Sequence, residues 1–380
     1  MDISAKIENL NYRPKLLPDL PGCSIGDFES GKMAGASSFV LNHRGNVFGV
    51  SQWVSPKRTR TYPYARVYDT MGSQLRITII PFVKDEGFDG DRDFIQWDSV
   101  SLMSLLNVYV IIGYYKTAAR SARYKNKITD QVLDYAYLRE QVDKMIDYRS
   151  SALHWNLNQL ENLPTVAERA ARTYEEISRS LGVRMHSSEG MEKRIQSIKD
   201  KVVSFKDLSR KMAKEAQHRE ICTAQPKEST LGKKATITII NYLGGVYHLT
   251  VDQTRVISDR AFLMEMKHSK TQYVPHIADI KDGLVKMMLF ANLSETRVDS
   301  RILPHTAVLG LTSSLFTGYC DSTMSDEEVM TCIRKGTLSE TQQKTITEVF
   351  AEARENKFLV FLSDSERPDY QERILKDVNV

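Results

Sequence analysis

The chain has 380 residues, of which 41% are hydrophobic and 26% charged, and its 52 Lys and Arg against 48 Asp and Glu give a net charge of +4. This apolar content can fill real cores, which excludes a wholly disordered chain and predicts two or three domains. No apolar run approaches the roughly 18 residues that a membrane span needs, and the N-terminal residues lack the apolar stretch of a secretory signal. Four scattered cysteines without CxxC spacing predict reduced thiols in a cytoplasm.

The first region, residues 1–127, is predicted to be an α/β module. Residues 34–83 read as strands that turn at 43–46 and at 71–73, where glycine interrupts β-rich runs. A polar, acidic loop then leads into an apolar segment from about Asp98 to Tyr115, for which we predict a helix.

The second region, residues 128–222, is predicted to be helical. Its apolar residues recur at spacings of three and four, in YAYLREQVDKMIDY and again in MEKRIQSIKDKVVSF. Pro164 and the segment 182–190 mark breaks between at least three helices.

The third region, residues 223–380, alternates between strands and helices. The segments ATITIINYL, GVYHLTVD and RAFLMEMKHS read as three successive strands, and a helix is predicted from about Ile277 to Leu293. A strand in HTAVLGLTSSL, a helix around 340–354 and a last strand in KFLVFLS follow. This α-β-β-β-α-β order favours an α/β domain with a mixed sheet.

Two carboxylates and a lysine lie on two adjacent predicted strands of the third region. Asp252 ends the strand GVYHLTVD, and Glu265 and Lys267 share one face of the next strand because side chains repeat every two residues. An antiparallel hairpin would bring Asp252 close to that pair. Two carboxylates offer the hard oxygen ligands that Mg²⁺ prefers, and the lysine can hold or help deprotonate a water, or stabilise a phosphorane-like transition state. The pattern indicates hydrolysis of a phosphodiester.

The acid-x-Lys pattern by itself is weak, because the chain contains it at 265–267, 279–281 and 355–357. Only the first lies in an apolar strand with a second acid upstream at the end of another strand. The alternative is a pair of solvated charges side by side on an edge strand. The apolar neighbours of Glu265 favour a central strand, where unpaired charges are costly.

The hairpin VDQTRVISDRAFLMEMK resembles that of the PD-(D/E)xK nuclease superfamily, the fold of most type II restriction endonucleases. Asp252 matches the first acid of the motif, with Val251 where proline is common, and Glu265 and Lys267 match the ExK half. The segment HIADIKDGLVKMMLFANL is similar to the helix that packs on the sheet after the ExK strand. Two N-terminal segments, at 39–70 and 78–112, also look like restriction-enzyme sequence, whereas the helical middle region has no counterpart.

This resemblance implies a sequence-specific, Mg²⁺-dependent endonuclease that cleaves double-stranded DNA and leaves 5′-phosphate ends, as in prokaryotic restriction-modification. It implies that Asp252 and Glu265 hold Mg²⁺ and that Lys267 positions and activates the attacking water. The expected fold class is α/β (α+β), with a restriction-endonuclease-like mixed-sheet core at 223–380. We also expect an N-terminal α/β DNA-recognition module, and a helical region that clamps DNA or mediates dimerisation. Since cutting both strands needs two active sites or two visits, we expect a homodimer.

Basic residues near the N-terminus are the expected DNA contacts. The acid-free segment SPKRTRTYPYAR combines cations that neutralise phosphates or read guanine edges with tyrosines. The expected contacts there are Lys57, Arg58, Arg60, Tyr62, Tyr64 and Arg66. A basic loop without a partner is the alternative. A second acid-free stretch runs from Ser99 to Thr129. A basic stretch at 191–219 fits a solvated helix as well as it fits a DNA contact.

An acidic segment between residues 85 and 93 is the competing candidate for a metal site. Glycines at 87 and 90 favour a solvated loop, and the segment lacks the ligand ladder of a Ca²⁺ loop. A role in holding metal or phosphate remains open. The chain has no HxH or HExxH spacing that would predict zinc or haem, and no GxxxxGK[ST] or GxGxxG motif that would predict a nucleotide cofactor.

Two other functions remain open. One is a structure-specific or repair nuclease of the same superfamily, and the other is a DNA-binding protein without catalysis. The presence of Asp252, Glu265 and Lys267 together speaks against a decayed core.

Overall fold

The computed structural model describes residues 2–8, 10–57, 62–187, 189, 233–241, 246–299, 301–364 and 375. The chain forms two compact units: unit 1 comprises Met1–Pro18 and Lys214–Val380, and unit 2 comprises Asp19–Ala213. This division differs from the three regions expected from the sequence. The first strand of the chain joins the sheet of the C-terminal region, and the described helices of the middle region pack within unit 2. The basic stretch at 191–219 lies outside the described residues.

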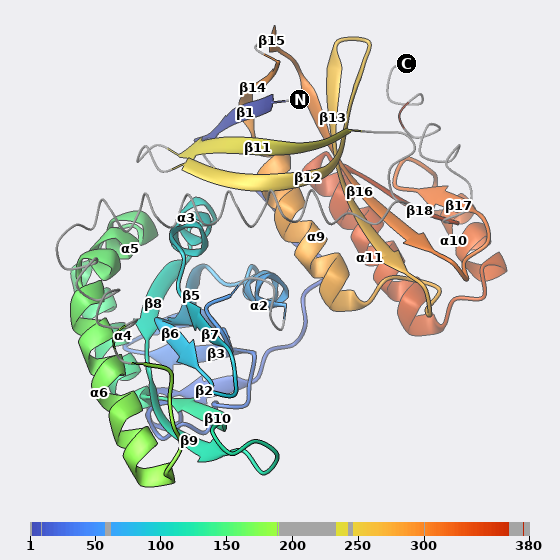
Figure 1. Cartoon of the computed structure of the whole chain (residues 1–380). Coiled ribbons are helices and arrows are strands. Elements are labelled where there is room, and N and C mark those ends of the chain that lie inside the picture. Colours follow the sequence, from blue (N-terminus) through green and yellow to red (C-terminus); the bar gives the residue numbers. More distant parts are fainter. Residues whose placement is uncertain are drawn as a thin grey trace. The chain divides into compact units, whose positions relative to one another are not determined.

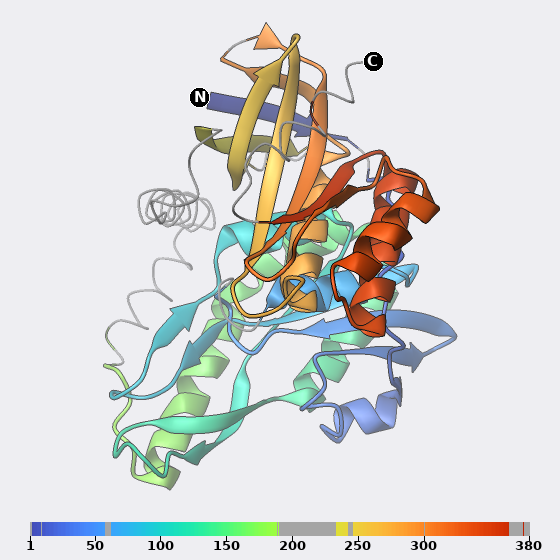
Figure 2. The same cartoon turned by 90° about the vertical axis from the view of Figure 1, so that its right-hand side faces the viewer.

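Unit 1 is built on a nine-stranded sheet with the order β15-β14-β1-β11-β12-β13-β16-β18-β17 (Figures 1 and 2). Its strands are β1 (Asp2–Ile7), β11 (Lys233–Asn241), β12 (Val246–Ile257), β13 (Arg260–Ser269), β14 (Ser294–Val298), β15 (Arg301–Ile302), β16 (His305–Ser313), β17 (Tyr319–Asp321) and β18 (Leu359–Asp364).

The pairing of this sheet is mixed, which confirms the predicted α/β class with a mixed sheet. Strands β11, β12 and β13 pair antiparallel in succession, whereas β13, β16 and β18 pair parallel. Strand β13 is central, and residues 261–265 are buried on both faces of the sheet. A strand covered on both faces reads as a continuous apolar run, which is why AFLM precedes Glu265.

Three described helices connect the strands of unit 1: α9 (Ile277–Phe290), α10 (Asp326–Lys335) and α11 (Glu340–Asn356). Helix α9 packs on β13 and β16, α11 on β18 and α10 on β17. Helices α10 and α11 begin with capping boxes, in which a serine side chain and a residue three positions later satisfy the first backbone N–H groups. The elements β11, β12, β13, α9 and β16 follow in the predicted order, but the prediction missed β14 and β15 between α9 and β16, and β17 and α10 between β16 and α11.

Unit 2 has a five-stranded sheet with the order β2-β3-β4-β5-β8 and two ribbons, β6-β7 and β9-β10 (Figure 1). Its strands are β2 (Gly22–Ser24), β3 (Ser38–His43), β4 (Asn46–Gln52), β5 (Leu75–Pro81), β6 (Val83–Asp85), β7 (Arg92–Phe94), β8 (Tyr109–Gly113), β9 (Tyr115–Arg120) and β10 (Ile128–Leu133). Its described helices are α1 (Ile25–Glu29), α2 (Pro63–Asp69), α3 (Trp97–Leu105), α4 (Tyr135–Tyr148), α5 (Ala152–Glu161) and α6 (Leu163–Leu181).

The helices of the middle region form where the 3.6-residue periodicity predicts them. Helix α6 turns an apolar face with spacings of three and four residues inward, and it ends at Gly182 in the left-handed conformation. Helices α4, α5 and α6 pack against β8, and α6 also packs against β6 and β9. They therefore belong to the core of unit 2.

Three predicted elements of unit 2 are wrong. Residues 64–69 form helix α2 instead of a strand, because Pro63 at the first helical position starts a helix despite the β-prone Tyr and Val residues. The helix predicted from Asp98 to Tyr115 ends at Leu105, and strand β8 follows after Asn107 with its positive φ of 54°. Residues 128–133, predicted to be helical, form strand β10.

No helix in the described part of the chain has both the length and the apolar character of a membrane span.

Candidate active site

The predicted acid Asp252 lies inside β12 rather than at a strand end, at an irregularity in the pairing of β12 with β11. The register shifts there between the pairs Val251–Ala235 and Thr254–Lys233, and β12 pairs with β13 from Gln253 onward. The backbone N–H of Met266 on β13 donates a 2.8 Å hydrogen bond to Oδ2 of Asp252. This contact fixes the carboxylate beside the ExK residues. Its other oxygen, Oδ1, accepts no hydrogen bond from the described residues.

The predicted acid Glu265 is 2% exposed and bridges two lysines. Its Oε1 lies 3.0 Å from Nζ of Lys267, and its Oε2 lies 2.7 Å from Nζ of Lys286. The first contact shows that Glu265 and Lys267 share one face of β13, as the alternation predicts. Because β13 has a strand on each side and Glu265 is buried, the alternative of a solvated edge strand is wrong.

Helix α9 completes the cluster with two residues one turn apart. Asp282 Oδ2 accepts a 2.7 Å hydrogen bond from Lys267 Nζ, and Lys286 Nζ also donates to the carbonyl of Thr250 at 3.3 Å. Gly283 lies between them, and a Cβ there would stand 3.3 Å from Cε of Lys267 and 2.7 Å from a methyl of Leu309. The glycine therefore lets α9 approach β13 closely enough for these contacts.

The charges of this cluster are nearly balanced, with three carboxylates and two ammonium groups. Burial disfavours the charged form of Lys267, but the carboxylates of Glu265 and Asp282 outweigh it and raise the pKa of Lys267 above its ordinary value. Burial opposes the charge of Lys286 too, and the carboxylates of Glu265, Asp252 and Asp282 likewise raise its pKa. Both lysines are therefore cations at neutral pH, and neither is a base at rest.

The donor set is compatible with Mg²⁺ held in part by substrate. Asp252 offers an oxygen without a hydrogen bond, next to the buried carboxylate of Glu265, and Mg²⁺ commonly binds one or two carboxylates together with phosphate oxygens. Among the described residues, no group of three or more His, Cys, Asp or Glu side chains is arranged to hold a metal ion. Metal would therefore bind here through few protein ligands.

Sequence reasoning missed Asp282 and Lys286. The signal was the presence of a lysine within the apolar run GLVKMMLF of a helix with most of its residues buried. A lysine in such a helix needs a carboxylate partner. An acid four residues before it on the same helix face would then have drawn attention to the whole cluster.

The expected DNA contacts in the segment SPKRTRTYPYAR differ in their exposure to solvent. Tyr64 is 3% exposed and packs edge-on against Trp53 in the core of unit 2, so it cannot reach DNA without leaving the core. Arg66 donates a 2.6 Å hydrogen bond to the carbonyl of Gln52, and its partial burial lowers its pKa. Lys57 and Tyr62 are exposed. The expected contacts Arg58 and Arg60 lie outside the described residues.

The competing acidic segment is only in part the solvated loop predicted for it, because Asp89 and Asp91 are exposed in the turn between β6 and β7 whereas Asp85 and Glu86 are buried. Asp85 is 2% exposed and accepts from the Gly87 N–H at 2.8 Å, and its Oδ1 lies 2.8 Å from Nδ1 of His186. The buried Glu86 lies 3.2 Å from Nζ of Lys84 and 3.0 Å from Nζ of Lys127. Asp85 and Glu86 therefore connect the β6-β7 ribbon to Lys127, in the turn between β9 and β10, and to His186, which follows α6.

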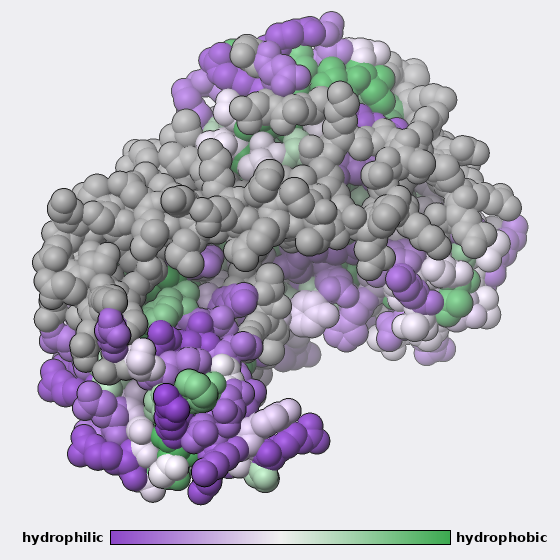
Figure 3. Space-filling view, in the orientation of Figure 1, coloured by the Kyte–Doolittle hydropathy of each residue, from purple (hydrophilic) through white to green (hydrophobic). Residues whose placement is uncertain are grey.

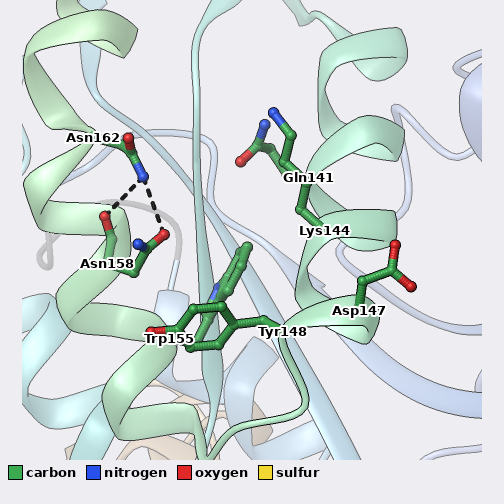
Figure 4. Close-up of a pocket in the computed structure, with 7 residues that line it drawn as sticks. All are labelled: Gln141, Lys144, Asp147, Tyr148, Trp155, Asn158 and Asn162. Carbon is green, nitrogen blue, oxygen red and sulfur yellow. Dashed lines mark hydrogen bonds between the residues drawn. The ribbon is translucent and has the colours of Figure 1, made fainter.

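Unit 2 also has a pocket of about 410 Å³ between α4 and α5 (Figure 4). Tyr148 and Trp155 form one end of it, and their rings meet edge to face at 5.8 Å. Gln141 and Lys144 enter from α4 and Asn158 from α5 (Figure 4). Asp147 is the only acid among its lining residues, which gives no basis for a Mg²⁺ site there.

Comparisons with protein-family models, with curated proteins and with solved structures found no match to this chain.

Proposed function

We propose that this protein is a site-specific, Mg²⁺-dependent endonuclease that hydrolyses phosphodiester bonds of double-stranded DNA and leaves 5′-phosphate ends. The observation that carries the proposal is the cluster on β12, β13 and α9. It combines a buried Glu265 between two lysines with an Asp252 that keeps one oxygen without a hydrogen bond.

The position of this cluster supports the proposal. The three residues that match the PD-(D/E)xK pattern lie together on the sheet, and the helix after the ExK strand packs on that strand. A buried charged group is costly unless it is paired, so retaining five charged side chains in one place needs a reason beyond stability. Phosphodiester hydrolysis supplies that reason.

The proposed role of each residue follows from its charge. Asp252 and Glu265 would hold Mg²⁺, which when bound acts as a Lewis acid that lowers the pKa of water and offsets charge on the phosphate. Lys267 keeps its proton at neutral pH because its pKa is raised. It therefore orients the attacking water and stabilises negative charge as it develops on the phosphate, without accepting the proton. Asp282 holds the ammonium of Lys267 in place at 2.7 Å.

The biological setting follows from the same proposal. A chain with one such site cuts both strands of a duplex most simply as a homodimer. A site-specific nuclease of this kind would act in restriction-modification in a prokaryotic cytoplasm.

The test is digestion of DNA of known sequence by the purified protein in Mg²⁺, followed by sequencing of the ends. Discrete cuts at one sequence with 5′-phosphates are expected, and they should disappear with EDTA. Cuts confined to junctions or flaps would point to the repair nuclease instead. Binding of DNA without any cleavage would support the alternative of a DNA-binding protein without catalysis.

A Lys267→Ala variant makes the assignment specific to this site. Cleavage should be abolished while DNA binding stays nearly unchanged, because the lysine acts on the reacting phosphate. Lys84→Ala is the matched control, since Lys84 also pairs with a buried glutamate but lies in unit 2. Full cleavage of plasmid DNA by Lys267→Ala would refute the assignment.

A further inference from the structure

The ribbon β9-β10 of unit 2 ends in a basic tip that lies within the acid-free stretch from Ser99 to Thr129. Strands β9 and β10 pair antiparallel from Arg120–Ile128 to Tyr115–Leu133. In the connecting turn, the N–H of Ser121 donates to the carbonyl of Lys127 at 2.9 Å. The Ser121 hydroxyl accepts 3.3 Å hydrogen bonds from the N–H groups of Arg123 and Tyr124. The hairpin is visible as a loop that extends from its sheet in Figure 1.

The cations of this hairpin fall into two groups. Lys116 lies 3.4 Å from Asp134, and Lys127 lies 3.0 Å from Glu86, so both anchor the hairpin to its unit. The tip cations are exposed and have no carboxylate partner anywhere in the described chain; they are Arg120, Arg123 and Lys125. In Figure 3 the surface at this hairpin, at the lower edge of the view, is mainly hydrophilic.

An exposed aromatic ring accompanies these cations. Tyr124 is 49% exposed at the tip, and the ammonium of Lys127 lies 5.8 Å from the centre of its ring. Exposed arginines, a lysine and a tyrosine without any acid between 99 and 129 form a surface suited to a polyanion with planar groups.

The acidic segment of unit 2 acts as the scaffold for this hairpin. The N–H of Ile128 donates to the carbonyl of Glu86 at 2.9 Å, and the N–H of Asp89 donates to the carbonyl of Asn126 at 3.1 Å. The Asn126 N–H in turn donates to the side chain of Asp89 at 2.9 Å. These contacts hold residues 126–128, at the end of the turn, and the exposed cations Arg123 and Lys125 lie in the same turn.

We propose that the β9-β10 hairpin is a DNA-binding arm and that its tip enters the major groove of duplex DNA. This inference rests on the proposed function, which supplies the DNA. The major groove, about 12 Å wide, admits a two-stranded ribbon, and arginine there can bind guanine through two hydrogen bonds. The anchored turn gives the arm a fixed direction, so the three tip cations meet phosphates and base edges at a low entropic cost.

The test measures the affinity for a linear duplex of mixed sequence as salt is varied, in EDTA so that no cleavage occurs. The variant Arg120→Gln/Arg123→Gln/Lys125→Gln should bind about tenfold or more weakly near 0.1 M salt. Its plot of log affinity against log salt should be shallower by about 0.9 for each of the three cations that contacts a phosphate. Protection of guanine N7 from dimethyl sulfate in the major groove should also be lost.

The matched control removes the same charge from helices of the same unit. Lys144→Gln/Arg172→Gln/Arg179→Gln changes three exposed cations on α4 and α6, and it should keep the wild-type salt slope. If the wild type cleaves DNA but the hairpin variant keeps its affinity and slope, the hairpin inference is overturned and the nuclease proposal stands. If the wild type neither binds nor cuts DNA, both fall. If instead the hairpin variant loses only the capture of an acidic protein, the arm serves protein binding and the inference is overturned.

Discussion

Both units contain a buried glutamate held between two lysines. In unit 1, the oxygens of Glu265 lie 3.0 and 2.7 Å from Lys267 and Lys286. In unit 2, those of Glu86 lie 3.2 and 3.0 Å from Lys84 and Lys127. One lysine of each pair is two residues away along the chain, so the spacing and the ion-pair distances are similar in the two clusters.

The surroundings of the two glutamates differ. Next to Glu265 stands a second carboxylate, Asp252, with an oxygen that accepts no hydrogen bond from the described residues. The backbone next to Glu86 is bonded to the hairpin instead, and its acidic neighbours Asp85 and Asp89 cap turns and hold N–H groups. A buried glutamate between lysines is therefore not by itself a catalytic site. In our proposal, the unit 1 cluster is set apart because Asp252 makes no ion pair with the described residues, whereas Asp85 lies 2.8 Å from Nδ1 of His186 and 3.8 Å from Arg92.

Of the variants that compare the two units, Asp252→Asn is expected to have the largest effect. The amide oxygen can keep the hydrogen bond from the Met266 N–H, so the fold should persist while the charge for Mg²⁺ is lost. We expect the rate of DNA cleavage in a plasmid assay to fall on the order of a thousandfold. The control Asp93→Asn changes a unit 2 acid that bonds Ser55 at 3.2 Å. Equal losses in the two variants would erase the distinction between the units.

Neutralising each glutamate compares the two clusters as structural elements. Glu265→Gln leaves two buried ammonium groups without their shared carboxylate, which should cost about 3 kcal/mol in the free energy of unfolding of unit 1. Glu86→Gln should cost about 1 kcal/mol, because Lys84 and Lys127 are more accessible to water than Lys267 and Lys286. Urea unfolding monitored by hydrogen exchange in each unit gives both values. A larger loss in unit 2 would contradict this ranking.

Gly283→Ala tests the close approach of α9 to β13. The added methyl must displace Leu309 and press on Lys267, which misplaces the ammonium by a few tenths of an ångström. We expect cleavage to fall about tenfold. Stability should change by less than about 1 kcal/mol, since the gain in helix propensity offsets part of the crowding. Gly26→Ala on α1, where a Cβ meets only Ser24 at 3.9 Å, should leave cleavage unchanged.

The smallest effect concerns acid pH in unit 2. Burial would raise the pKa of Glu86, but the hydrogen bonds and charges of Lys127 and Lys84 outweigh it and hold that pKa below its usual 4.5. Its contribution to stability is therefore present above pH 4.5 and is lost as the pH falls through the lowered value. The exchange protection of the Ile128 N–H should decline over that window in the wild type. The decline should be shallower in Glu86→Gln, and identical curves would rule out Glu86 as the anchor.

The sequence predicted the part of the candidate site that depends on local pattern. Alternation placed Glu265 and Lys267 on one face, and the apolar run before them indicated a central strand. It could not place Lys286, because that contact depends on how closely α9 packs, which Gly283 decides. The ribbon β9-β10 was missed because TAAR has weak β propensity and follows a long apolar run that resembles a helix. The parallel pairing of β1 with β11 joins residues more than 230 positions apart, which local patterns do not report.

The most direct test of the proposed active site is the Mg²⁺-dependent cleavage of one duplex by the wild type, Asp252→Asn and Glu86→Gln under identical conditions. We expect discrete double-strand cuts with 5′-phosphate ends by the wild type and by Glu86→Gln, and none by Asp252→Asn at the same protein concentration. Undiminished cutting by Asp252→Asn, with loss of cutting in Glu86→Gln, would contradict this expectation and move the catalytic site to unit 2.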